Sequence, residues 1–80
     1  MIDWFRKQEN TMTTEILFIV EDAPEGGFTA RAASASIFTE ADSLPQLREN
    51  VREAVACHFD GGERPRLIRL HYVRDEVIAT

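Results

Sequence analysis

The segment that most restricts the fold of this chain is TEILFIVED, residues 14–22. It is rich in β-branched and aromatic residues and is followed by a Pro-Glu-Gly-Gly turn signal, a combination typical of a β-strand. Because neighbouring side chains of a strand point to opposite faces, two alternating sets can be read from it. Both sets are apolar, which predicts a central strand covered on two sides. The sets are Ile16, Phe18 and Val20, and Leu17 and Ile19.

The rest of the chain predicts three more strands and one helix, in the order β-β-β-α-β. Gly26-Gly27 allows the positive φ values of a tight hairpin, and alternating residues 28–32 and 37–40 then form the second and third strands. Ser43 and Gln46 match a capping box that starts a helix, which Gly61-Gly62 ends. Residues 67–74 alternate again as a fourth strand. One arc of the helix is apolar and packs on the sheet, with Leu44, Leu47, Val51, Ala54, Val55, His58 and Phe59 inside it.

A single helix cannot cover both faces of this sheet. A strand-helix-strand crossover is right-handed and covers one side only. Ile68, Leu70 and Tyr72 of the fourth strand are predicted to face the helix, so the opposite face has no cover within residues 14–80. That face is too apolar for ordinary surface, which predicts that a partner, a dimer interface or the N-terminal tail covers it. Its predicted residues are Leu17, Ile19, Leu67, Arg69, His71 and Val73.

Length and charge favour a small acidic domain that binds proteins. Eighty residues allow one core, so residues 14–80 are predicted as one domain, residues 1–13 as a tail or short turn, and a homo-oligomer as a stabilising state. The formal charge of -5 disfavours direct DNA or RNA binding and suits a basic protein partner. The lone Cys57 excludes an intrachain disulfide and favours the cytoplasm, and no apolar run is long enough for a membrane span or export signal.

The residues that could carry chemistry are few. Cys57, His58 and His71 are too few for a metal site, and a Cys57–His71 pair lacks an orienting third group. His58 is read as a boundary histidine that reaches solvent at the end of the helix. We therefore predict a protein that is not an enzyme, with no catalytic, cofactor-binding or metal-binding residues. Strand-end carboxylates leave a metal-dependent nuclease as an alternative to solvated charge, through Asp22, Glu40 and Asp42.

Three segments in order, residues 22–28, 39–44 and 47–54, resemble the N-terminal domain of HicB antitoxins. In that family an acidic-Gly-Gly-aromatic hairpin leads to a Thr-x-Gly-Asp-[ST]-Leu helix start and an E-N-x-[RK]-E-A helix. The resemblance covers about residues 14–73 and implies a partly RNase H-like sheet of strand order 3-2-1-4, mostly antiparallel. The chain departs from the family at residues 34–37, where Ser-Ala-Ser-Ile replaces Leu-Pro-Gly-Cys, and at Ala41, which replaces a glycine.

The resemblance also implies a function. HicB antitoxins oligomerise as dimers or tetramers and neutralise HicA, a small basic toxin that cleaves messenger RNA. They usually carry a C-terminal DNA-binding domain, so a chain that ends soon after the fourth strand resembles a standalone HicB-like domain that does not bind DNA directly. We expect an antitoxin or a related protein-binding module that needs no cofactor. The alternatives are a homo-oligomeric interaction domain without a toxin partner and a degenerate RNase H-like nuclease.

Overall fold

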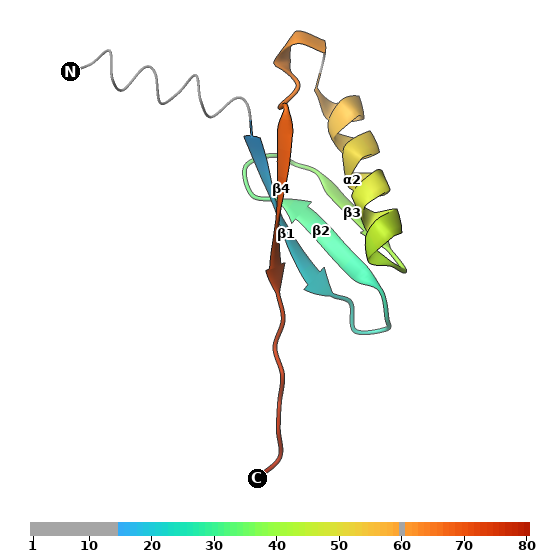
Figure 1. Cartoon of the computed structure of the whole chain (residues 1–80), viewed down its shortest axis with the longest axis vertical. Helices are drawn as coiled ribbons and strands as arrows, with labels where there is room; N and C mark the ends of the chain where they lie inside the picture. Colours follow the sequence, from blue (N-terminus) through green and yellow to red (C-terminus); the bar gives the residue numbers. More distant parts are fainter. Residues whose placement is uncertain (1–14, 60) are drawn as a thin grey trace, which may run out of the picture.

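The computed structural model describes residues 15–59 and 61–80, and these contain four strands and one α-helix (Figure 1). The predicted N-terminal tail, residues 1–13, lies outside the described residues, as does Thr14. A short 3-10 turn precedes the last strand. The elements in chain order are β1 (Glu15–Asp22), β2 (Phe28–Ala32), β3 (Phe38–Ala41), α2 (Leu44–His58), η1 (Gly61–Glu63) and β4 (Leu67–Val73).

The sheet has the order β3-β2-β1-β4, as the resemblance implied. β1 pairs antiparallel with β2 and parallel with β4, and β2 pairs antiparallel with β3. β1 is therefore an inner strand, as predicted, although α2 covers only one of its two apolar faces. The predicted α+β fold, a β-β-β-α-β chain with one helix on a mostly antiparallel four-stranded sheet, is confirmed.

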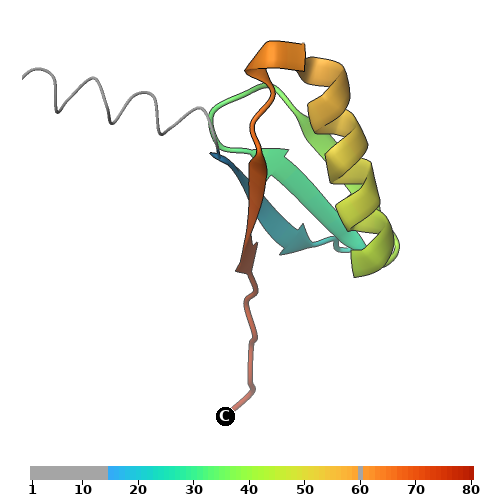
Figure 2. The same ribbon diagram turned by 45° about the horizontal axis from the view of Figure 1, so that its top comes forward.

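α2 packs on one face of the sheet, mainly over β2 and β3, and leaves β4 at the far edge (Figures 1 and 2). Asn50 of α2 also donates a side-chain hydrogen bond of 3.1 Å to the carbonyl of Glu40 in β3. The core lies between the helix and the sheet and contains no buried polar residue among those described. Its buried members are Ile16, Phe18, Val20, Ala30, Ile37, Leu47, Val51 and Val55.

The β1–β2 hairpin depends on two glycines with positive φ. Gly26 has φ 104° and Gly27 has φ 84°, a region that side chains other than glycine rarely adopt. The amide of Ala23 donates to the carbonyl of Gly27 at 2.9 Å, which closes the turn. A Cβ on Gly27 would lie 2.6 Å from the carbonyl oxygen of Ala41, at the end of β3. Gly27 thus permits both the turn and its close approach to β3.

The helix starts at the predicted N-cap, but only half of the predicted capping box forms. The amide of Gln46 donates to the Ser43 hydroxyl at 3.3 Å. The reciprocal bond, from the Ser43 amide to Gln46 Oε1, is not seen, and the Gln46 side chain instead donates through Nε2 to Asn50 Oδ1 at 2.9 Å. A glutamine at this position can bond along the helix surface as well as back to the cap, and here it does the former.

Replacing Ser43 with Ala is expected to lower the free energy of unfolding by about 1 kcal/mol, because the Gln46 amide loses its partner. Urea denaturation followed by circular dichroism measures the change. Gln46→Ala is the control. It keeps the amide and removes only an exposed side-chain bond, so a loss as large as that of Ser43→Ala would contradict the assigned role of the cap.

The helix ends earlier than predicted. Its last residue is His58, and Phe59 is the C-cap in an extended conformation, with its amide bonded to the carbonyl of Val55 at 3.1 Å. The two glycines expected to stop the helix instead lie within the η1 turn. Phe59 packs partly against the core, so the burial of an aromatic ring turns the chain before the glycines are reached.

Three strand boundaries and one side chain differ from the prediction, and one of the three is the end of β3, which lies one residue later, at Ala41. β3 begins one residue later, because Ile37 is buried before the strand starts and its carbonyl accepts the amide of Ala32 at 3.0 Å. β4 ends one residue earlier, at Val73. Ile68 and Leu70 pack against the core as expected, but Tyr72 is 49% exposed. The helix does not reach far enough across the sheet to cover the end of β4.

Candidate protein-binding surface

The side chains that alternate with the core residues form the face of the sheet opposite α2, called here the helix-free face. The strand registers place Leu17 beside Arg69 and Ile19 beside His71. All six residues predicted as an interface therefore share this face. Its full membership is Glu15, Leu17, Ile19 and Glu21 from β1, Thr29 and Arg31 from β2, Phe38 and Glu40 from β3, and Leu67, Arg69, His71 and Val73 from β4.

The helix-free face carries large apolar groups in contact with solvent. Leu67 is 60% exposed and Phe38 62%, while Val73, Arg69 and His71 are also exposed. Within residues 15–59 and 61–80 the α-helix lies on the other side of the sheet (Figure 2). Apolar side chains mixed with a few charged anchors are typical of protein interfaces.

The prediction missed the contribution of β2 and β3 to this face. Phe38 pairs with Arg31, which in turn pairs with Ile19, and Ile19 pairs with His71. These four residues form one row across the sheet, from β3 to β4. The signal for Phe38 was ambiguous, because Ile37 and Phe38 are adjacent apolar residues and either could have faced the helix. The small residues at 34–36 do not show which side chains of the third strand point toward the helix.

Two solvent-exposed arginine–carboxylate pairs connect β4 with the two ends of β1. Arg69 bonds the carboxylate of Glu15 through Nε, with Nη2 at 3.3 Å from Glu15 Oε1. Arg74 bonds Asp22 through both arms of its guanidinium, at 2.8 Å from Nε and 3.1 Å from Nη2. Hydrogen bonding by the guanidinium, followed by its charge, lowers the pKa of Glu15 and of Asp22 and raises the pKa of each arginine.

Acid is expected to weaken the attachment of β4. Because the pKa values of Glu15 and Asp22 are below their ordinary values of 4.5 and 3.8 in the folded state, the pairs stabilise fully above these values. The unfolded chain binds protons first as the pH falls, so this stabilisation is lost from about pH 5 downward. Urea midpoints measured at falling pH should decline less steeply for the Arg69→Gln/Arg74→Gln variant. Equal slopes for the two proteins would contradict the assignment.

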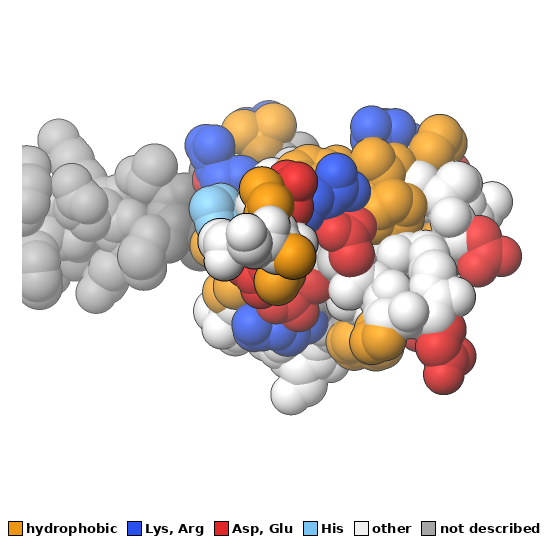
Figure 3. All heavy atoms as spheres, turned by 90° about the horizontal axis from the view of Figure 1, so that it is seen from below, with side chains coloured by type: hydrophobic (Ala, Val, Ile, Leu, Met, Phe, Trp, Pro, Cys, Tyr) orange, Lys and Arg blue, Asp and Glu red, His pale blue; other side chains and the backbone are white. Residues whose placement is uncertain are grey.

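One end of the helix-free face is acidic. Glu21 and Glu40 lie on either side of Thr29 in one row across the sheet. A hollow of about 450 Å³ adjoins this row, and Glu21, Asp22 and Asp75 line it together with Arg74. Figure 3, which looks onto the end where the C-terminal segment leaves the domain, shows acidic side chains interspersed with apolar ones. This end offers carboxylates to a basic side chain of a partner.

The residues considered for catalysis are spread over the domain, and two of them, Glu40 and His71, lie in different rows of the helix-free face. Cys57 and His58 are exposed on the last turn of α2, with the imidazole of His58 against the ring of Phe59 at 4.9 Å, whereas His71 lies on the helix-free face. His58 is thus an exposed boundary histidine, as predicted. Asp22 is bonded to Arg74. In the described part of the chain, no three His, Cys, Asp or Glu side chains converge as metal ligands would.

Among residues 15–59 and 61–80, no helix has the length and apolar character needed to cross a membrane.

Comparison with known proteins places the chain in a family. No family model matches it, and no solved structure matches it significantly. A UPF0150 protein of Archaeoglobus fulgidus is 54% identical over 52 residues, which cover 65% of this chain and 77% of the relative. A UPF0150 protein of Thermotoga maritima is 38% identical over 65 residues, which cover 81% of this chain and 91% of the relative. Identity at this level over most of both relatives shows that the chain belongs to the UPF0150 family.

Proposed function

We propose that this protein is a HicB-like antitoxin, or a related protein-binding module, whose helix-free face binds and neutralises a small basic mRNA-cleaving toxin of the HicA type. The observation that carries the proposal is a sheet face that combines exposed apolar side chains with an acidic end. The proposal assigns no catalytic step to the chain. The antitoxin role in this proposal rests on the resemblance of residues 22–28, 39–44 and 47–54 to HicB domains.

The apolar part of the face supports stable binding. Phe38 and Leu67 lie toward opposite edges of the sheet, and the half-buried Leu17 and Ile19 lie on the central strand between them. A partner that covers these side chains removes apolar area from water, the main favourable contribution to association. Arg69 is paired with Glu15, which offsets its charge toward a basic partner, while Arg31 adds one positive charge to the face.

The acidic part supports fast and selective encounter. The chain has a formal charge of -5, and Glu21, Glu40 and Asp75 are exposed at one end of the face. A basic toxin is drawn to this end, and a toxin surface that normally binds RNA phosphates would find carboxylates there instead. Such steering changes the association rate more than the final affinity, so raising the salt concentration should slow association markedly.

Co-expression with the product of a neighbouring gene that encodes a small basic protein tests the proposal. We expect a complex that survives purification and that stops the mRNA cleavage of the basic protein at about a one-to-one ratio. Phe38→Glu should raise the Kd of this complex about a hundredfold, because it introduces a charge into the apolar part of the interface.

Ala56→Glu is the matched control, since it adds the same charge at an exposed position of α2, which lies on the other side of the sheet. It should change the Kd less than about threefold. If Phe38→Glu and Ala56→Glu weaken the complex equally, the helix-free face is not the binding surface. If no complex forms and light scattering shows oligomers that Phe38→Glu dissociates, the face joins copies of this chain instead.

A further inference from the structure

We propose that the outer edge of β4, together with residues 74–80, is a dimerisation surface at which two copies pair their β4 strands antiparallel about a two-fold axis at Leu70. This inference is independent of the proposed function, because it uses the edge of the sheet and leaves the centre of the helix-free face open. The partner is a second copy of this chain.

The first observation is the open edge itself. Among the described residues, β4 pairs only with β1, so the backbone N–H and C=O groups of its other side have no strand partner. Proteins normally protect such edges by keeping them short or placing proline or lysine in them. The opposite edge, β3, has four residues, whereas β4 has seven and contains neither proline nor lysine. Three of the seven are large apolar residues in solvent: Leu67, Tyr72 and Val73.

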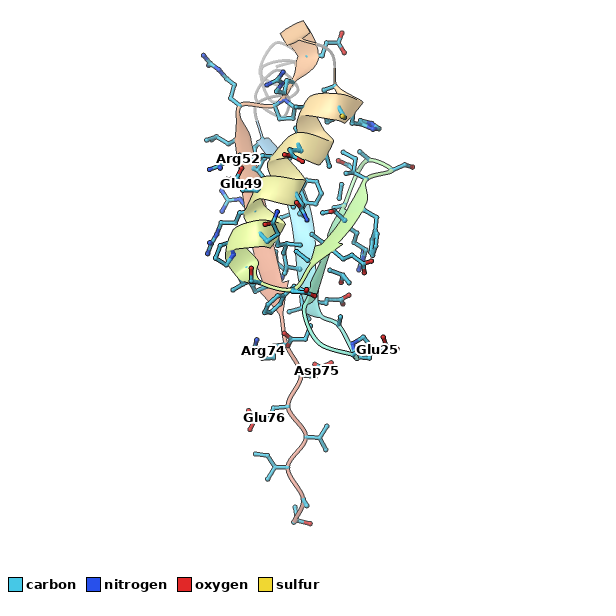
Figure 4. All side chains as sticks on the ribbon, turned by 90° about the vertical axis from the view of Figure 1, so that its right-hand side faces the viewer. Glu25, Glu49, Arg52, Arg74, Asp75 and Glu76 are labelled. Atoms are coloured by element: carbon cyan, nitrogen blue, oxygen red, sulfur yellow. The ribbon has the colours of Figure 1, made fainter. Side chains whose placement is uncertain are left out.

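The second observation is the segment that continues β4. Residues 74–80 leave the domain as an extended chain, with Arg74, Asp75 and Glu76 following one another along it (Figures 1 and 4). Val77 is 95% exposed and Ile78 75%. Burying two such side chains on a second copy is favourable.

The register follows from side-chain direction. A slip of one residue in the pairing of the two β4 strands reverses which face each side chain occupies. Only registers that differ by two residues, or a multiple of two, keep both helices on the same side of the joined sheet. An axis at Leu70 sets Leu67 opposite Val73 of the second copy and Ile68 opposite its Tyr72. Each of these contacts occurs twice, and each joins apolar side chains.

The neighbouring registers are worse. An axis at Arg69 opposes that arginine with its own copy, and an axis at His71 opposes Leu67 with Asp75. The axis at Leu70 leaves one like-charged pair, Arg66 with Arg74 of the second copy. Asp22 already binds Arg74 in its own chain, at 2.8 and 3.1 Å, which relieves this repulsion.

A cleft beside β4 fits the same register. It has a volume of about 120 Å³ and lies between α2 and β4, which do not close against each other. Ile68 forms part of its wall, and the register places Tyr72 of the second copy opposite Ile68. A tyrosine can bury its ring on the apolar wall and keep its hydroxyl in water. The lining residues are Arg48, Val51, Arg52, Ile68 and Leu70.

Sedimentation velocity on the full chain tests the surface. We expect a dimer at about 20 μM, and a dimer Kd raised about a hundredfold by Tyr72→Glu, which places two carboxylates at the symmetric clefts. Phe38→Glu makes the same change at an exposed position of the opposite sheet edge and should leave the Kd within about twofold. A monomeric wild type, or dissociation by Phe38→Glu with Tyr72→Glu still dimeric, would overturn the proposal.

Disulfide trapping tests the axis. In a Cys57→Ser background, Leu70→Cys should form a covalent dimer with oxidised glutathione, because opposite Cα atoms in antiparallel pairs are about 5 Å apart. Ile68→Cys is the control. Its two copies would be separated by roughly 14 Å along the strands, too far for a disulfide. Equal trapping at both positions would exclude this register.

Discussion

Replacing Phe18 with Ala is expected to lower the free energy of unfolding by about 4 kcal/mol, the largest effect of any single substitution considered for this protein. Phe18 is fully buried and lies on the helix-facing side of β1, the central strand. Alanine would leave a cavity where the ring now meets the core. A domain of eighty residues is stabilised by only about 4 to 12 kcal/mol, so the variant should retain about 0 to 8 kcal/mol.

Urea denaturation at one fixed protein concentration measures this loss, since any self-association makes the apparent stability depend on concentration. Phe38→Ala is the matched control, because it removes the same ring from a side chain that is 62% exposed. It should cost less than about 1 kcal/mol. Similar losses for the two variants would mean that the helix-free face is as tightly packed as the core.

Gly27→Ala is expected to destabilise the protein by about 3 kcal/mol, because it combines two separate costs. A φ of 84° is unfavourable for any residue with a Cβ, by about 1–2 kcal/mol. The new Cβ would also lie 2.6 Å from the Ala41 carbonyl oxygen, a backbone atom that moves only if β3 moves. The overlap adds a cost of about 1–3 kcal/mol.

Gly26→Ala separates the two costs. Gly26 also has a positive φ, but nothing lies within 4 Å of the position of its Cβ. This variant should therefore lose about 1–2 kcal/mol, from the backbone alone. Thermal and urea unfolding of both variants give the comparison. If Gly26→Ala and Gly27→Ala lower the free energy of unfolding equally, the close approach of Gly27 to the Ala41 carbonyl does not contribute to the effect.

Local patterns were enough to predict most of the fold. The two apolar sets of β1 identified the central strand, the glycine pair identified the hairpin, and Ser43 identified the start of the helix. The strand order came from the resemblance to HicB domains. The six predicted interface residues fell on one face because alternation along β1 and β4 determines side-chain direction once the two strands are parallel neighbours.

Other features depended on contacts between distant parts of the chain. Phe38 was missed because adjacent apolar residues give no alternation at the start of β3. The exposure of Tyr72 depends on how far α2 extends across the sheet. The periodicity of the helix sequence gives no information about this distance. The pairs Glu15–Arg69 and Asp22–Arg74 join residues 54 and 52 positions apart, and many other arginines and carboxylates in the chain could have paired instead.

The parallel pairing of β1 with β4 also has a consequence for the order of folding. The β1–β2 and β2–β3 pairings and the packing of α2 on β2 and β3 use contacts between nearby segments, whereas β4 must return to β1 from the far end of the sequence. Contacts with long loops form slowly. β4 should therefore join the sheet last during folding and open first in the native state, so its amide hydrogens should exchange with solvent sooner than those of β1 and β2.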